Sequence, residues 1–162
     1  MTSLLVSPGA AADLCDLLCF DIGAERFAMP LANVEEVVDG CDVDTSSRSG
    51  AMVGILRVRH ELLAVFDASR VLQTTRQGAE PVTLVLPSMR GLIGLLVDNA
   101  EAAPQVSLNG LKTPPALVSA DRVLDGVLRV GARWVGLVNT AAFVEAMIAD
   151  VAVHSSAGNH GR

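Results

Sequence analysis

The sequence predicts an all-β protein, and two observations carry that prediction. Short apolar runs recur along the chain, and clusters of Gly, Pro, Asp and Ser separate them, which is the pattern of successive strands and turns. Several runs, such as LLAVF and LIGLLV, are apolar at every position, so both faces of these strands are expected to be buried. Such strands fit sheets that close into barrels, or that pack between two subdomains, better than an open sheet with one wet face.

The first half of the chain contains a series of expected strands. A tight turn at Gly23 joins the first two, and a break at Pro30 precedes the third. The most informative stretch, VGILRVRHELLAVFD at 53–67, sets two strand-like runs about an Arg-His-Glu turn. The stretch 40–50 has many turn formers and no periodicity, so a surface loop is expected there. The predicted strands are 16–22, 25–29, 34–39, 52–58 and 61–66.

The second half begins with a short predicted helix at 67–73, whose first turn Asp67 can cap. A polar connector follows at 74–80, and a loop rich in Pro and Asn is expected at about 104–116. Strands are predicted at 82–87, 91–99, 123–130 and 133–138. The final segment, 139–151, places apolar residues on one helical stripe, so a C-terminal helix is expected to pack as a lid on a barrel. The stripe consists of Phe143, Val144, Met147, Ile148 and Val151.

Composition and end segments indicate one domain. The chain has 162 residues, of which 51% are hydrophobic, and this is enough for a single domain with a proper core. Residues 1–14 are small and Gly/Ala-rich and are expected to form a flexible leader. Residues 15–150 are expected to form the folded domain, and the polar residues 151–162 a disordered tail.

Charge and aromatic content argue against several classes of partner. The net charge is −6, and aromatic residues make up 3% of the chain, so neither a basic face nor stacking platforms for nucleic acid are expected. No apolar run reaches membrane-spanning length, and no signal peptide is predicted. The three cysteines have no metal-ligand spacing and are expected to be reduced thiols. The protein is therefore expected to be soluble and cytoplasmic, without direct membrane insertion.

The sequence contains no motif typical of an active site, a metal site or a cofactor site. His60-Glu61-Leu62-Leu63 begins like a zinc metalloprotease motif, but Ala64 stands where the second ligand histidine is required. Asp67 and Asp98 each end an apolar strand, and they are expected to cap turns rather than to form an acid-base pair. We expect no catalytic residue, no metal and no cofactor. The alternative is a small β-barrel enzyme or ligand-binding protein that uses Asp67 or His60 near a pocket.

The order of these residues resembles the CheW-like family, which comprises chemotaxis coupling proteins and the related domain of their histidine kinases. The resemblance extends over about 16–149 and is looser in the second half. It departs from the family where Arg57-Val58-Arg59-His60 replaces Asn-Leu-Arg-Gly, and where Ala64 replaces the usual proline. The glycine lost at His60 could have served a turn with positive φ. The matching residues are Ile22-Gly23, Phe27-Ala28-Met29, Val34-Glu35-Glu36-Val37, Gly54 to His60, Val65-Phe66-Asp67, 93–98 and 135–144.

The resemblance implies two SH3-like five-stranded β-barrel subdomains side by side, with short helices and no active site. It also implies a non-catalytic adaptor that couples chemoreceptors to a histidine kinase, in flagellar or pilus-based motility or a related signalling array. The expected partners are a CheA-like chemotaxis histidine kinase and the hairpin tip of a methyl-accepting chemoreceptor.

The resemblance also assigns the site residues. Arg59 matches the family arginine linked to coupling, although a turn arginine is by default solvated. From the sequence alone, Val34 and Val37 are expected to be core valines. The residues that match the family's receptor groove between the barrels are Val34, Glu36, Val37, Ala100 and Ala103.

Overall fold

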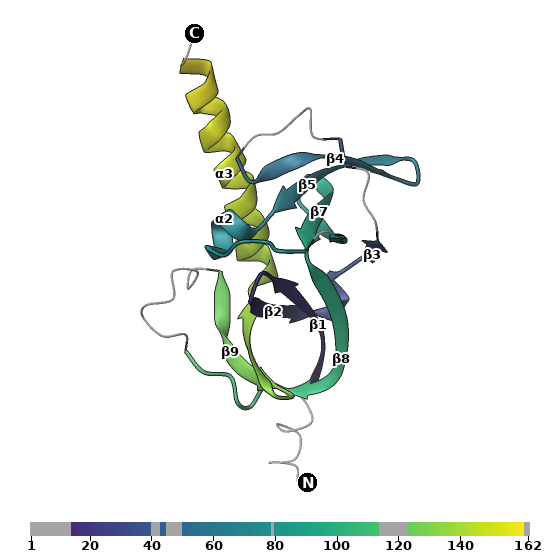
Figure 1. Cartoon of the computed structure of the whole chain (residues 1–162), viewed down its shortest axis with the longest axis vertical. Helices are drawn as coiled ribbons and strands as arrows, with labels where there is room; N and C mark the ends of the chain where they lie inside the picture. The colour runs from purple at the N-terminus through teal and green to yellow at the C-terminus, as the bar shows by residue number, and fades with distance from the viewer. Residues whose placement is uncertain (1–13, 40–42, 45–49, 79, 114–122, 161–162) are drawn as a thin grey trace.

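A computed structural model of the chain (Figure 1) describes residues 14–39, 43–44, 50–78, 80–113 and 123–160. Its described strands form two five-stranded sheets, which confirms the predicted all-β class with two five-stranded units. The first sheet has the order β8 (Asn99–Ser107), β1 (Leu14–Ile22), β2 (Glu25–Pro30), β10 (Arg133–Val138), β9 (Leu124–Val130). The second sheet has the order β3 (Glu36–Asp39), β6 (Val82–Ser88), β7 (Gly91–Val97), β5 (Glu61–Asp67), β4 (Met52–Val58).

The two sheets are interleaved along the chain. The hairpin β1–β2 joins β8, β9 and β10, and the strands between them in sequence form the second sheet. Both sheets have the same arrangement of strands. In the first sheet β2, the second strand of the hairpin β1–β2, pairs in parallel with β10. In the second sheet β7, the second strand of the hairpin β6–β7, pairs in parallel with β5. The strand clusters on either side of the polar connector therefore do not correspond to the two sheets. Periodicity identifies a strand but not its partner, which explains the difference.

Most of the core lies between the two sheets. One cluster of buried residues, here called the shared core, includes Phe20 and Phe27 of the first sheet and Leu84 and Leu95 of the second. Each sheet also buries a smaller cluster on its other face. In the first sheet this cluster contains Leu17, Cys19, Ala28, Leu128, Val135 and Leu137, and in the second Leu56, Val65 and Leu96. Both faces of the central strands are thus buried, as their unbroken apolar runs predict.

Helix α3 (Thr140–His160) packs into the shared core and runs alongside both sheets (Figure 1). Asn139 Oδ1 accepts the Ala142 N–H at 3.1 Å, which satisfies a free donor of the first turn. The predicted stripe is confirmed: Phe143, Val144 and Met147 are buried, and Ile148 and Val151 pack against the shared core. The helix thus contacts a core common to both sheets, where a lid on one barrel was expected. It continues to His160, through residues 151–160 that were expected to form a disordered tail.

Local turns follow the sequence closely, with one exception in the β4–β5 hairpin. Positive φ angles occur at the turn residues Gly23 (65°), Arg59 (58°), Gly91 (102°) and Gly131 (63°), as tight hairpins require. In the β4–β5 turn the residue with positive φ is therefore Arg59, not His60. The short helix α2 (Ser69–Leu72) follows β5, and Asp67 Oδ1 accepts the Ser69 N–H at 2.9 Å, as predicted.

Strand β8 corrects the expected loop at 104–116, because the strand extends to Ser107. Proline is tolerated there since β8 is an edge strand, where a missing N–H breaks no ladder on the open side. Gln105 has a φ of 51°, and its N–H donates to Asp16 Oδ1 at 2.9 Å, next to a register shift in the pairing with β1. Residues 114–116 of the expected loop, and residues 1–13 of the expected leader, lie outside the described residues.

In the described part of the chain, the ladders leave each sheet open between its edge strands. In each sheet, one isolated β-bridge connects the segment after one edge strand to the opposite edge strand. Asp44, which follows β3, bridges to Ile55 of β4, and Lys112, which follows β8, bridges to Val127 of β9. The sheets are therefore strongly curled, and residues on opposite edges come close to each other.

Candidate partner-binding surface

The segment from the short 3-10 helix η1 (Leu31–Asn33) to β3 holds three of the residues that the resemblance assigns to the receptor groove. Val34 is half-buried and packs against the shared core. Val37 lies opposite Leu84 of β6 and is 43% exposed, because β3 is an edge strand. Glu36 alternates to the other face of β3, opposite Val85. The sequence suggested either two core valines or two groove valines, and neither holds for both: Val34 packs against the core, whereas Val37 is exposed to solvent.

Arg59 lies at the tip of the β4–β5 hairpin and contacts β3 across the curl of the second sheet. Its Nη2 atom is 3.0 Å from Glu36 Oε1, and the two side chains are 77% and 32% exposed. An ion pair this exposed contributes little to stability, so a partner carboxylate could replace Glu36 at low cost. The fold thus brings together two residues, Arg59 and Glu36, that the resemblance assigns to different contacts.

The two alanines of the expected second wall lie on opposite faces of β8. Ala100 pairs with Phe20 and packs against the shared core, whereas Ala103 pairs with Leu17 and packs against the core of the first sheet. Residues three apart on a strand alternate in this way. The exposed residue on the same face as Ala100 is Ala102, which pairs with Leu18. Ala100 and Ala103 therefore do not form one wall.

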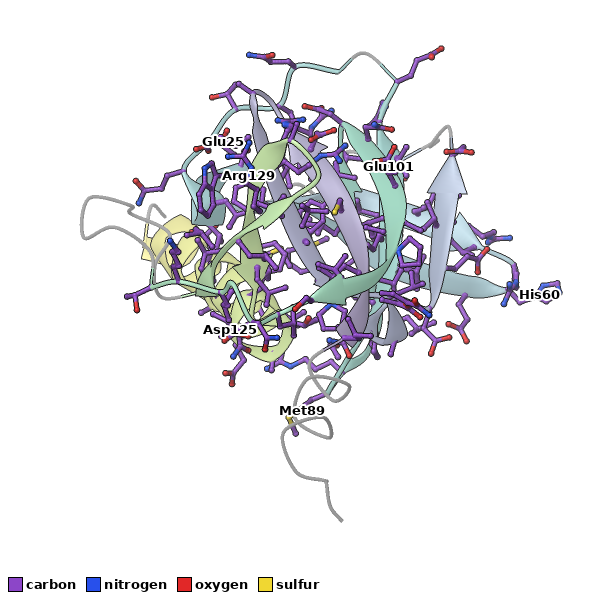
Figure 2. All side chains as sticks on the ribbon, turned by 90° about the horizontal axis from the view of Figure 1, so that it is seen from below. Glu25, His60, Met89, Glu101, Asp125 and Arg129 are labelled. Atoms are coloured by element: carbon purple, nitrogen blue, oxygen red, sulfur yellow. The ribbon has the colours of Figure 1, made fainter. Side chains whose placement is uncertain are left out.

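β3 and β8 are edge strands of different sheets, and they lie on the same side of the molecule (Figures 1 and 2). Leu31, in the short helix between β2 and β3, is a further exposed apolar residue; it is 37% exposed and directly follows the break at Pro30. Sequence reasoning missed Leu31 and Ala102. The proline break was a usable signal for Leu31, because a residue forced out of a strand is seldom fully buried. Nothing in the local sequence marks Ala102.

The alternative reading, in which Asp67 or His60 serves a ligand pocket, places these residues at opposite ends of β5. His60 lies in the exposed turn before the strand, and it protrudes from the edge of the molecule (Figure 2). A hollow of about 500 Å³ between β5, β7 and α3 borders neither residue. Its lining is mostly apolar and consists of Leu62, Ala64, Phe66, Arg90, Leu92, Ile93, Ile148 and Val151.

Asp67 and Asp98 meet at Arg76 instead of forming an acid-base pair. Arg76 Nε is 3.3 Å from Asp67 Oδ2, and Arg76 Nη1 is 3.5 Å from Asp98 Oδ1. Asp98 also accepts the backbone N–H groups of Gly23 at 2.7 Å and of Gln77 and Gly78 at 2.9 Å. Burial alone would raise the pKa of the Asp98 carboxyl, but these N–H donors and the Arg76 guanidinium hold that pKa below its usual range. An acid held ionised in this way is a structural anchor, not a proton donor at neutral pH.

The described residues contain neither a metal-binding cluster nor a membrane-spanning helix. Among them, no group of three or more His, Cys, Asp or Glu side chains is arranged to hold a metal ion. Within the same residues, no helix combines the length and the apolar character needed to cross a membrane.

Comparison with known proteins agrees with this architecture. A sequence model described as the CheW-like domain matches residues 16–147. The crystal structure of the scaffolding protein TtCheW from Thermoanaerobacter tengcongensis superposes with a TM-score of 0.71 at 16% sequence identity. The match covers 80% of this chain and 87% of that one, and at this identity it supports the fold alone. No curated protein sequence gives a significant match.

Proposed function

The chain belongs to the CheW-like domain family, and from this membership we propose that it is a non-catalytic adaptor that couples chemoreceptors to a CheA-like histidine kinase. The similar solved structure is that of a scaffolding protein, which supports a role in holding partners together. The receptor ligand in this proposal is the helical hairpin tip, which would enter a groove as an amphipathic helix pair.

The observation that carries the proposal is the match of the CheW-like domain model to residues 16–147, and its proposed site is supported by the contact between Arg59 and Glu36 at 3.0 Å. This contact joins the residue proposed for coupling to the edge strand proposed for receptor binding. A partner that engages Arg59 would displace Glu36 from this weak ion pair and free the carboxylate of Glu36 on β3, so the two contacts would lie side by side. Interfaces are enriched in arginine, and most of their energy resides in a few such residues.

The proposed receptor surface combines Val34 and both sides of the edge strand β3, which carry Glu36 and Val37, with the face of β8 that carries Ala100. In this proposal Ala102 replaces Ala103 as the exposed alanine of the surface, because Ala103 packs against the core of the first sheet. Small side chains on β8 would let a helix approach the strand closely. His60 and Asp67 do not support the enzyme or ligand-binding alternative that uses them, because they are apart and Asp67 is engaged by Arg76.

We expect Arg59→Ala to weaken binding of the kinase domain, the receptor hairpin, or both by roughly 1 to 3 kcal/mol, which is typical of an interfacial arginine. The fold should be unchanged, because the side chain is 77% exposed and its ion pair is weak. Titration calorimetry with each purified partner domain measures the effect. Arg57→Ala is the matched control, since Arg57 is an exposed arginine of the same hairpin. Unchanged affinity for both partners would remove Arg59 from the coupling surface.

A further inference from the structure

The chain has a single tryptophan, Trp134, and its side chain is 52% exposed. Trp134 lies on β10 directly opposite Arg129 of β9. The neighbouring pair, Val135 and Leu128, faces the smaller core of the first sheet, so Trp134 and Arg129 lie on the opposite face, at a part of it that the shared core leaves exposed. A large, rigid aromatic side chain left open to solvent is the kind of residue that anchors protein interfaces.

Two cations flank the indole ring. Lys112 Nζ is 5.9 Å and Arg129 Cζ is 6.0 Å from the ring centroid, which is within the range of cation–π interactions. Backbone pairing fixes the positions of both residues beside Trp134. Lys112 exchanges two backbone hydrogen bonds of 2.8 Å with Val127, and Arg129 pairs directly with Trp134 in the β9–β10 ladder. The three side chains therefore project from a preformed scaffold.

Neither cation has a carboxylate partner among the described residues. Four other arginines do, namely Arg26, Arg59, Arg76 and Arg133, whereas the exposed Arg57 and Arg90 also form no ion pair with a described residue. The parallel β2–β10 pairing sets Phe27 opposite Gly136. Continued two residues back along both strands, the same register sets Glu25 beside Trp134. No ion pair joins Glu25 to either cation. On a chain of net charge −6, this is a local site of positive charge that is free to receive an anion.

We propose that Trp134, Lys112 and Arg129 form a docking surface for a short acidic segment of a partner protein. One apolar side chain of the segment would lie on the indole ring, and its carboxylates would bind the two cations with charge-assisted hydrogen bonds. Two cations are too few for nucleic acid or an anionic membrane, and the overall negative charge repels such polyanions. Arg129 and His60 lie on opposite sides of the molecule (Figure 2), so this surface is separate from that around Arg59.

Because Trp134 is the only tryptophan, its fluorescence reports on this surface directly. The probe is a synthetic peptide of alternating glutamate and leucine, and the reference is the same peptide with glutamine in place of glutamate. We expect a saturable change in emission with the glutamate peptide that weakens as salt is raised. The double variant Lys112→Gln, Arg129→Gln should bind about tenfold more weakly or not at all. Arg90→Gln, which removes an exposed charge from the β6–β7 turn, should bind as the wild type does.

Several results would overturn the proposal. A glutamate peptide that leaves the emission unchanged at low salt would show that the surface does not receive acidic segments. Equal affinity for the glutamine peptide, or for the double variant, would exclude recognition of carboxylates by Lys112 and Arg129. Tighter binding of a single-stranded oligonucleotide or of phosphatidylserine vesicles would assign the surface to a polyanion instead.

Discussion

Two constraints favour glycine at Gly23, and only one of them is local in the sequence. Its φ of 65° suits the tight β1–β2 turn, which the sequence predicts. In addition, a Cβ atom at this position would collide with the carbonyl oxygen of Thr75 in the polar connector. Thr74 Oγ1 also donates to Ile22 O at 3.1 Å, so the connector is held directly against this turn. The second constraint is invisible in the sequence, because Thr75 is far from Gly23 along the chain.

Replacing Gly23 by alanine should lower the free energy of unfolding by roughly 3 kcal/mol, because backbone strain adds to displacement of the connector. Gly131→Ala is the matched control, since Gly131 has a φ of 63° with no atom within 4 Å of the added Cβ. The control should lose about 1 kcal/mol from the left-handed conformation alone. Urea denaturation of both variants separates the two effects. Equal losses would mean that the connector moves aside without cost.

At the scale of elements, the central strands were predictable and the edge strands less so. β4 and β10 have the predicted bounds, because their apolar runs and hairpin turns agree. β8, with the sequence NAEAAPQVS, lacks a clear alternation, since an edge strand tolerates small residues, charges and proline. β3 was expected from Val34 and begins at Glu36. The edge strands also carry the proposed receptor surface, so the candidate site depends on the elements that the sequence defines least well.

The two faces of β8 give a test of the proposed receptor surface. Ala103→Trp should destabilise the fold by about 1 to 3 kcal/mol, because it overpacks the core of the first sheet. Ala102→Trp, on the exposed opposite face, should change stability by less than about 0.5 kcal/mol and yet block the receptor hairpin. Thermal unfolding and hairpin binding are measured on both proteins. A stable Ala103→Trp variant that blocks the receptor, beside an Ala102→Trp variant that binds normally, would move the receptor contact to the face of β8 that carries Ala103.

At the scale of the whole molecule, the sequence did not predict which strands belong to which sheet. Pairing of β2 with β10 depends on residues at opposite ends of the domain, and no local pattern encodes it. The same limit applies to the candidate site. The resemblance supplied Arg59 and Glu36, but their contact arises from the curl of the second sheet. Long-range contacts of this kind also hold the two sheets together, and Asp98 makes several of them.

Asp98 joins three parts of the molecule: the strand β7 that it follows, the β1–β2 turn of the first sheet, and the connector. Asp98→Asn replaces one of the accepting oxygens with a donor that faces backbone N–H groups. We expect this change to lower the free energy of unfolding by roughly 2 kcal/mol at neutral pH, as for a lost charged hydrogen bond. Asp39→Asn, at an exposed residue of β3, is the matched control and should leave stability nearly unchanged.

The acid dependence of stability provides an independent check on Asp98. Its pKa in the folded protein is lower than in the unfolded chain, where an aspartate titrates near pH 3.9. Its contribution to stability is therefore complete above that pH and is lost as the pH falls through the lower, folded value. Urea denaturation between neutral pH and about pH 3 should thus show a steeper acid loss in the wild type than in Asp98→Asn. Asp21 retains part of the slope in both proteins: burial alone would raise the pKa of its carboxyl, but the hydrogen bond and charge of Arg26 help to hold that pKa below its usual value. Parallel pH profiles would mean that Asp98 is not the charged anchor between the two sheets.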